Sequence, residues 1–256
     1  MMAVRRVSFD VIDSTNAEAM RRAAAGERGP LWIVAARQSA GRGRQGREWE
    51  SGPGNLYATL LVSLPVSADV AAQTSFVAAL AVFDLAAGVL GSADKLALKW
   101  PNDVLLDGAK LSGILIETVA HDTVGRTTVA IGMGVNLVHA PERTRYGATS
   151  LAEHGGHVAP DEAFARLAAA MGARLADWND GRGFAVIRRD WTARAAGLGR
   201  RASVTMGERT VVGQFTGLAS DGALLLSEPG GQLHVIHAGE VSLALESAVS
   251  GSSGTP

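Results

Sequence analysis

The chain has 256 residues, 47% of them hydrophobic and 19% charged, and its 24 lysines and arginines nearly balance its 25 aspartates and glutamates. This length allows one large globular domain or two unequal ones. A formal net charge of -1 excludes a general basic field of the kind that holds a protein on nucleic acid or anionic lipid. The absence of cysteine excludes disulfides, thiolate metal sites and a cysteine nucleophile, and it fits a reducing, cytoplasmic compartment.

No targeting or membrane segment is predicted. The N-terminal stretch MMAVRRVSFDVIDSTN lacks the apolar core of a signal peptide, and no later stretch approaches the roughly 20 uninterrupted apolar residues of a membrane span. We therefore expect a protein that is neither exported nor inserted into a membrane.

The first part of the chain is predicted to alternate helices and strands. Cap-type residues and an alanine-rich run predict a helix over 16–25, and LWIVAARQ predicts a buried strand over 31–38. A strand over 55–64 follows a glycine-rich loop. An apolar-faced helix is then expected over 70–90.

The middle of the chain is predicted to return to strands. Their turns are expected at Asp107-Gly108 and around Gly125. Because consecutive strands imply antiparallel pairing, the fold class is α/β (α+β) with a mixed sheet. Two more helices are expected over 161–180 and 184–195. The three strands are KLALKWPNDVLL, AKLSGILIETVA and TTVAIGMGVNLV.

After residue 197 the pattern changes to short strands broken by Gly-Glu, Asp-Gly and Gly-Gly turns, without helical periodicity. Roughly 50 residues of this kind predict a small β-barrel. The expected organisation is a catalytic domain over 1–197, a barrel over 198–246 and a disordered tail over 247–256.

One loop is rich in arginine and glycine. Three of each lie between Gly41 and Arg47, within QSAGRGRQGREWES. Glycines let backbone N–H groups approach an anion, and arginines supply planar forks for carboxylate or phosphate. An RNA-binding RGG-like segment or a merely solvated loop remains an alternative. Placement between two apolar strands, directly before Trp49, argues against the RGG type.

A second group of polar residues lies within KWPNDVLLDGAKLSGILIE. Pro101 interrupts a strand pattern there and indicates an edge, a bend or a bulge. Lys110 begins an otherwise apolar strand, and Gly113 in its middle suggests close approach of a ligand or another backbone. The plainer alternative is a hairpin with a solvated lysine at its mouth.

Taken together, four motifs in this order and spacing resemble the biotin protein ligases, also called biotin-[acetyl-CoA-carboxylase] ligases. The resemblance covers about residues 11–245. It implies joining of biotin to ATP, giving biotinyl-5'-AMP and pyrophosphate, and then transfer to one lysine of a biotin carboxyl carrier domain. The implied fold is a sheet related to class II aminoacyl-tRNA synthetases, followed by an SH3-like barrel. The motifs are DSTN at 13–16, GRGRQGREW at 41–49, the lysine-containing stretch at 99–117 and GMGVNL at 132–137.

The resemblance also implies a biotin site. The neutral, polar ureido group of biotin needs fixed donors and acceptors in an otherwise apolar wall. Ser14 is equally a candidate helix cap, and the two uses are compatible. The implied biotin-binding residues are Ser14, Thr15, Asn16, Gln38, Gly41, Arg42, Gly43, Lys110 and Gly113.

For adenylation, Lys110 matches the family's catalytic lysine, which lies between two repelling anions. Arg44 and Asp103 are further catalytic candidates. Asp103 could orient Lys110 or help take the proton from the incoming carrier lysine, although a capping or turn role suits it equally. Trp49 suits either adenine stacking or ordinary core packing. Mg²⁺ would neutralise the pyrophosphate. The implied ATP-binding and adenylate-binding residues are Arg42, Arg44, Arg47, Trp49, Lys110 and Asn136.

Only twelve residues precede Asp13, too few for the winged-helix domain of many family members. The resemblance therefore implies a monofunctional enzyme that binds a carrier domain but neither DNA nor a membrane, as a monomer or weak homodimer. A lipoate ligase is the nearest alternative enzyme. A nucleic-acid-binding module is the alternative from another class.

Three remaining features carry less weight. GMGVN lacks the third glycine and the following helix of a dinucleotide fingerprint, so we reject that interpretation. Residues 138–160 suggest a mobile loop. Paired histidines without supporting carboxylates make a poor metal site, so no metal site is expected and surface positions are predicted for His154, His157, His234 and His237.

Overall fold

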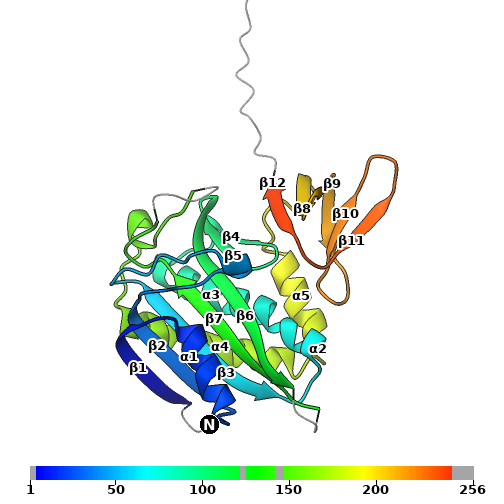
Figure 1. The fold of residues 1–256 in the computed structure, drawn as a ribbon. Coiled ribbons are helices and arrows are strands. Elements are labelled where there is room, and N and C mark those ends of the chain that lie inside the picture. The colour runs from blue at the N-terminus through cyan, green and yellow to red at the C-terminus, as the bar shows by residue number, and fades with distance from the viewer. Residues whose placement is uncertain (1–3, 122–124, 142–146, 244–256) are drawn as a thin grey trace, which may run out of the picture. The chain divides into compact units, whose positions relative to one another are not determined.

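A computed structural model describes residues 4–121, 125–141 and 147–243. The chain divides into two compact units, 1–195 and 196–256. Unit 1 contains one seven-stranded sheet with helices on both faces (Figure 1), which confirms the expected α/β fold class with a mixed sheet.

The sheet of unit 1 has the strand order β1-β2-β3-β7-β6-β5-β4. Only the β1–β2 pair is parallel, and the other five neighbouring pairs are antiparallel. The strands are β1 (Arg5–Ile12), β2 (Leu31–Gln38), β3 (Leu56–Leu64), β4 (Leu96–Lys99), β5 (Asp103–Leu106), β6 (Ala109–His121) and β7 (Thr127–Val135).

The helices of unit 1 begin and end close to the expected positions. The predicted helix over 70–90 is divided at Gln73 into α2 and α3, although Gln73 itself keeps right-handed helical φ and ψ. The helices are α1 (Thr15–Ala24), α2 (Ala68–Ala72), α3 (Thr74–Leu90), α4 (Pro160–Trp178) and α5 (Phe184–Thr192), with short 3-10 turns η1 (Arg44–Gly46) and η2 (Ala152–His154).

Strand β1 was not predicted from the sequence. Its side chains are mostly exposed and include Arg5, Arg6 and Asp10, so it lacks the apolar pattern of a buried strand. It forms one edge of the sheet and pairs only with β2. Its strand character comes from that pairing rather than from burial.

The stretch 95–106 was predicted as one strand and this is wrong. It forms a hairpin in which β4 and β5 pair antiparallel, with Leu98 opposite Val104. Pro101 lies in the turn, where the missing N–H of proline costs no ladder hydrogen bond. The next turn is as predicted: Asp107 and Gly108 both have positive φ, at 53° and 79°, which suits a two-residue hairpin loop.

Strand β7 shows how the two faces of the sheet differ. Its residues alternate between small side chains, Ala130, Gly132 and Gly134, and the larger Ile131 and Met133. The small residues lie on the face covered by α1, because Ala130 belongs to the core cluster that includes Ala19 of this helix. The opposite face is covered by α3 and α4 (Figure 1). Close approach of α1 to the sheet therefore follows from small residues on β7.

Helix α3 is apolar almost all round and lies in the core of unit 1. The span Ala68–Leu90 has the length and composition of a membrane-crossing helix, with a mean hydropathy of 1.7, but 67% of that window is buried inside the protein. A helix that is apolar on every side and covered by protein is a core helix.

Unit 2 is a five-stranded antiparallel sheet with the order β11-β10-β9-β8-β12, which confirms the expected small all-β domain. Its turns contain Gly207, Gly222 and Gly231 at positive φ, as the turn signals predicted. The predicted tail over 247–256 lies outside the described residues. The strands are β8 (Arg201–Met206), β9 (Arg209–Leu218), β10 (Leu224–Ser227), β11 (Leu233–Ile236) and β12 (Glu240–Leu243).

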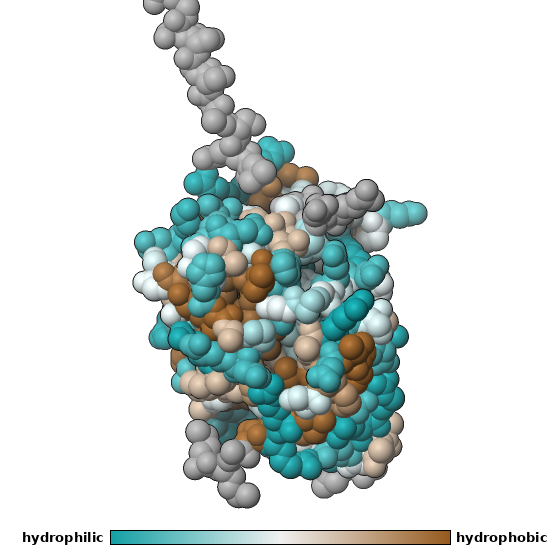
Figure 2. Space-filling model, turned by 90° about the vertical axis from the view of Figure 1, so that its left-hand side faces the viewer, coloured by the Kyte–Doolittle hydropathy of each residue, from teal (hydrophilic) through white to brown (hydrophobic). Residues whose placement is uncertain are grey.

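On the surface, Figure 2 shows hydrophobic side chains in separate patches with polar side chains around them. Among the described residues, the exposed large hydrophobic side chains are all valines or leucines, and they occur in both units. Scattered exposure of this kind is normal for a protein surface.

Candidate functional site

Three glycines form the floor of a site on the α1-facing side of the sheet. Gly113 of β6 pairs directly with Gly134 of β7, and Gly132 lies two residues before Gly134 on the same face. Positions two apart on a strand are roughly 7 Å from each other. Each glycine accommodates a side chain that a Cβ atom would displace.

The ring of Trp49 lies on this floor. An added Cβ would come within 2.6 Å of the Trp49 indole at Gly134 and within 2.9 Å at Gly113. Trp49 Nε1 is buried and has no hydrogen-bond partner among the described residues. Trp49 therefore packs on the sheet surface beside the arginine loop and holds a buried donor directed at no protein acceptor.

Lys110 lies next to this tryptophan. Its Nζ is 5.4 Å from the Trp49 ring centroid, close enough for a cation–π interaction, and 2.6 Å from Asp103 Oδ1. The side chain of Lys110 is 21% exposed and that of Asp103 is 7% exposed. Among the roles considered for Asp103, this ion pair fits orientation of Lys110 better than a capping or turn role.

The arginine loop folds back on itself as a small hairpin. Arg42 and Glu48 form a β-bridge, and the N–H of Gly43 donates to the Arg47 carbonyl at 2.7 Å. Arg44 NH1 donates to Asn102 Oδ1 at 3.2 Å. This contact joins the loop to the β4–β5 turn, whereas Arg42 and Arg47 are exposed.

The DSTN motif forms the start of α1. Ser14 Oγ accepts from the N–H of Ala17 at 3.4 Å, so Ser14 does cap the helix. Asp13 accepts from both terminal nitrogens of Arg21, at 2.7 and 2.8 Å, and this hydrogen bonding lowers the pKa of the Asp13 carboxyl to about 2. These contacts fix the first turn of α1 over the sheet.

Thr15 and Gln38 are brought together, as the resemblance implies for residues of one pocket. The N–H of Thr15 donates to Gln38 Oε1 at 2.8 Å, and Thr15 Oγ1 lies 3.1 Å from the same oxygen. Gln38 Nε2 donates to Ser51 Oγ at 2.9 Å, and Ser51 Oγ donates to the Trp49 carbonyl. A Cβ at Gly41 would collide with this last carbonyl. Hydrogen bonds thus connect the start of α1 to the loop that carries Trp49.

Asn16 occupies the space above Gly132, where a Cβ would collide with its Oδ1. Asn16 Nδ2 donates to Glu117 Oε2 at 2.8 Å and to the Leu115 carbonyl at 3.3 Å. Thr59 Oγ1 lies 2.7 Å from Asn16 Oδ1. The Asn16 side chain is therefore fixed from two sides within the protein.

Asn136 lies beyond the end of β7 and is almost fully buried. Its Nδ2 donates to the carbonyls of Thr149, at 3.0 Å, and Lys110, at 3.4 Å. These bonds join the strand that carries Lys110 to the following loop. Part of the segment 138–160 lies outside the described residues, and its mobility stays a prediction.

Several residues of the site were not singled out from the sequence. Thr59, Ser51 and Glu117 gave no local signal, because polar residues in strands and loops are common. Gly132 and Gly134 did give one: glycines at alternate positions of a strand point to the same face and indicate close approach. The missed residues that the structure brings to the site are Ser51, Thr59, Asn102, Glu117, Gly132, Gly134 and Thr149.

Of the four histidines predicted to lie on the surface, His157 and His237 are exposed, whereas His154 and His234 are partly buried and hydrogen-bonded. In the described part of the chain, no group of three or more His, Asp or Glu side chains is placed to hold a metal ion.

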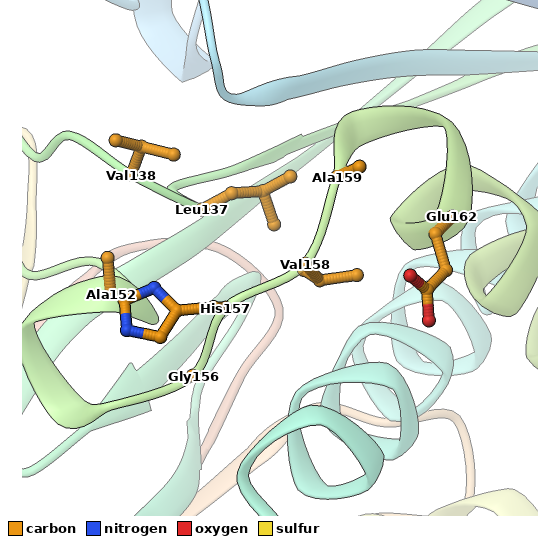
Figure 3. Close-up of a pocket in the computed structure, with 8 residues that line it drawn as sticks. All are labelled: Leu137, Val138, Ala152, Gly156, His157, Val158, Ala159 and Glu162. Atoms are coloured by element: carbon orange, nitrogen blue, oxygen red, sulfur yellow. The ribbon is translucent and has the colours of Figure 1, made fainter.

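A separate pocket of about 370 Å³ lies between the segment that follows β7 and the start of α4. Figure 3 shows its lining, which comes from Leu137 and Val138 after β7 and from the segment leading into α4, with Glu162 on the first turn of that helix. It contains none of the predicted site residues.

Two family profiles match the chain. The Biotin/lipoate A/B protein ligase family matches residues 8–136, and the Biotin protein ligase C terminal domain matches residues 197–244. The chain is 45% identical over 234 residues to a biotin–[acetyl-CoA-carboxylase] ligase of Paracoccus denitrificans, covering 90% of this chain and 96% of that protein. The chain belongs to the biotin protein ligase family. It has biotin–[acetyl-CoA-carboxylase] ligase activity, as the motifs predicted.

Other biotin protein ligases agree with this assignment. The ligase of Mycobacterium tuberculosis is 36% identical over 89% of this chain and 85% of its own length. The structure of the Aquifex aeolicus biotin protein ligase in complex with biotin and ATP superposes with a TM-score of 0.77, at 26% identity, over 94% of this chain and 98% of that chain. The first profile alone covers biotin and lipoate ligases, but these full-length relatives are biotin ligases. The lipoate alternative and the nucleic-acid-binding alternative are therefore set aside.

Proposed function

We propose that the site over Gly113, Gly132 and Gly134 carries out both steps of biotin ligation. In the first, a biotin carboxylate oxygen attacks the α-phosphorus of ATP, forming biotinyl-5'-AMP and releasing pyrophosphate. In the second, the amine of a carrier-domain lysine attacks the acyl carbon, an amide bond forms, and AMP leaves. The observation that carries this proposal is the Lys110 ammonium held between Asp103 and Trp49 above the glycine floor.

The pocket at the start of α1 is proposed to bind the ureido group of biotin. Ser14, Thr15, Asn16 and Gln38 lie there together with little exposure to solvent, and their hydroxyl and amide groups suit a neutral ligand with both donors and acceptors. Gly41 lets the loop approach Gln38 closely, and Arg42 and Gly43 continue that loop over the pocket.

Lys110 is proposed as the catalytic cation of the first step. Two anions, a carboxylate and a phosphate, approach each other there, and a fixed ammonium placed between them lowers the cost of their repulsion. Asp103 holds Lys110 in place and is proposed to help remove the proton from the carrier lysine in the second step.

The arginine loop is proposed to cover the nucleotide. Arg42, Arg44 and Arg47 supply positive charge for the triphosphate and retain the adenylate, and loop closure excludes the water that would hydrolyse it. Trp49 is proposed to stack on adenine. Its buried Nε1 has no hydrogen-bond partner among the described residues and suits contact with a ligand, and the glycines beneath the ring let it lie against the sheet. Hydrogen bonding of Asn136 to adenine stays a prediction.

Mg²⁺ is proposed to accompany ATP. It supplies charge neutralisation of the phosphates when bound. The described residues hold no cluster of three or more acidic or histidine side chains, so phosphate oxygens and water molecules would provide most of its ligands. Residues 1–197 are proposed as the biotin-binding and ATP-binding catalytic domain and 198–246 as an SH3-like domain. The protein is proposed to act in the cytoplasm on a biotin carboxyl carrier domain, as a monomer or weak homodimer.

Mass spectrometry of a carrier domain tests the two-step proposal. Incubation with the protein, biotin, ATP and Mg²⁺ should add one biotinyl group to one lysine, and omission of any single component should abolish the shift. Biotinyl-5'-AMP should accumulate when only the carrier is omitted. If the complete reaction gives the mass shift but the reaction without the carrier gives no biotinyl-5'-AMP, the proposed sequence of steps is contradicted.

A further inference from the structure

A chain of hydrogen-bonded side chains leads from outside the biotin pocket into it. It runs from Glu117 on β6 through Asn16 on α1 and Thr59 on β3 to Thr15. The successive heavy-atom distances are 2.8, 2.7 and 2.8 Å. Asn16, Thr59 and Thr15 are buried, so water does not readily replace any of these contacts.

The acceptors at one end set the direction of the first links. An ionised carboxylate and a backbone carbonyl accept but do not donate, so Asn16 must turn its Nδ2 toward Glu117 and the Leu115 carbonyl. Its Oδ1 then faces Thr59. Because an amide oxygen only accepts, the single hydroxyl hydrogen of Thr59 is used on Asn16.

The direction continues to Thr15. The hydroxyl hydrogen of Thr15 has two acceptors inside the protein, Thr59 Oγ1 at 2.8 Å and Gln38 Oε1 at 3.1 Å. Either bond directs this hydrogen into the protein. A lone pair of Thr15 Oγ1 is then left to accept a hydrogen bond from a ligand.

Without Glu117 the chain has an alternative state. Only the longer bond to the Leu115 carbonyl, at 3.3 Å, then holds the amide of Asn16 in place. Rotation of the amide by half a turn lets Nδ2 donate to Thr59, and the hydrogen of Thr59 turns to Thr15. The hydroxyl hydrogen of Thr15 then loses Thr59 as an acceptor, keeps the longer contact to Gln38 Oε1 at 3.1 Å, and can turn to donate to the ligand instead. With Glu117 present, this rotation would place Asn16 Oδ1 against a carboxylate oxygen, two acceptors in contact, which is unfavourable.

We propose that Glu117 is a positioning residue that sets the hydrogen-bond polarity of the biotin pocket, making Thr15 an acceptor for a ureido N–H. This inference rests on the proposed ureido role of Thr15. It adds a specificity determinant that does not itself touch the ligand.

The test compares biotin with its two ring carbamate analogues, in which oxygen replaces one or the other ureido N–H. Isothermal titration gives the Kd of each ligand for the wild type, Glu117→Leu and Glu117→Gln. The control is Thr118→Ala, at an exposed neighbouring position of β6. Urea unfolding of each variant checks that the fold is retained.

In the wild type, the analogue that places oxygen against Thr15 should bind at least about tenfold more weakly than biotin, because two acceptors then face each other. Glu117→Leu should reduce the ratio of the analogue Kd to the biotin Kd at least about tenfold, because biotin should bind more weakly and the analogue more tightly. Glu117→Gln can either accept from Asn16 or donate to it and should give an intermediate ratio, whereas Thr118→Ala should stay near the wild-type ratio. The Kd of the other analogue should change less in Glu117→Leu. A purely structural defect would instead raise the Kd of all three ligands to a similar extent.

A Glu117→Leu protein with native unfolding behaviour and the wild-type ratio for both analogues would overturn the inference. If Glu117→Leu does not fold, Glu117→Thr replaces it, because threonine suits a strand and is too short to reach Asn16. A wild-type ratio in that variant would overturn the inference in the same way. Thr15→Val separates the two proposals. An unchanged biotin Kd in Thr15→Val would overturn the ureido pocket and this inference with it, whereas weakened binding there with an unchanged ratio in Glu117→Leu would overturn the inference alone.

Discussion

Lys110 Nζ lies 2.6 Å from Asp103 Oδ1, and the two side chains come from neighbouring antiparallel strands. The pair lies beside the Trp49 ring and above Gly113. A lysine head group has a flexible four-carbon stem, and pairing with a buried carboxylate limits its positions. The cation is thus placed before any substrate binds.

Lys110→Ala is expected to reduce biotin-dependent pyrophosphate release at least about a hundredfold, because one fixed charge at the reacting anions is lost. Biotin binding, measured by titration, should change much less. Lys95→Ala is the control, since Lys95 forms an exposed ion pair with Asp107. Unchanged pyrophosphate release in Lys110→Ala would remove this residue from the mechanism.

Arg44→Gly is expected to release biotinyl-5'-AMP from the site, because it removes the hydrogen bond from the loop to Asn102 and adds backbone freedom. Lysines of unrelated proteins in the reaction should then become biotinylated. Asn102→Ala removes the other partner of the same bond and should produce the same labelling to a smaller extent. Blotting with streptavidin measures both, and labelling confined to the carrier domain would count against retention by this loop.

Gly134→Ala is expected to displace the Trp49 ring, since the new methyl group would lie 2.6 Å from the indole. Overpacking of this kind costs about 1–3 kcal/mol, and we expect the KM for ATP to rise about tenfold. Gly172→Ala is a matched control, because nothing lies within 4 Å of its added Cβ. Steady-state kinetics and Trp fluorescence measure the effect. Equal KM values for ATP in the two variants would show that displacement of Trp49 does not affect ATP binding.

Tyr57→Phe is expected to change the alkaline stability. Burial raises the pKa of the Tyr57 phenol to about 12, and its hydroxyl donates to the Gly52 carbonyl at 2.8 Å. Because the folded pKa lies above the unfolded value of 10, the stabilisation is complete below pH 10 and is lost as the pH rises through 12. Wild type should be about 1 kcal/mol more stable than the variant at pH 8, and the two should converge toward pH 11. If the difference between the urea midpoints of the two proteins stays constant from pH 8 to pH 11, the raised pKa of Tyr57 is contradicted.

Much of the fold follows from local patterns. The strands β2, β3, β6 and β7 have continuous or alternating apolar residues, and the Asp107-Gly108 turn has the residues that positive φ requires. Strand β1 and the β4–β5 hairpin could not be predicted from local patterns. The first is defined by pairing at a sheet edge. The second is defined by a turn at Pro101, which was interpreted as an edge, bend or bulge within one strand rather than as the turn of a hairpin.

The sequence by itself determined the reaction class, because the DSTN, arginine-glycine, lysine-strand and GMGVNL motifs occur in one order along the chain. It also determined which cation to expect, since Lys110 stands in an otherwise apolar strand. Only the tertiary structure decided which side chains act on one another. The links from Glu117 to Asn16 and from Thr59 to Thr15 join residues about 100 and 44 positions apart. Hydrogen bonds have directions that depend on every partner in space, and a sequence pattern reports only neighbours along the chain.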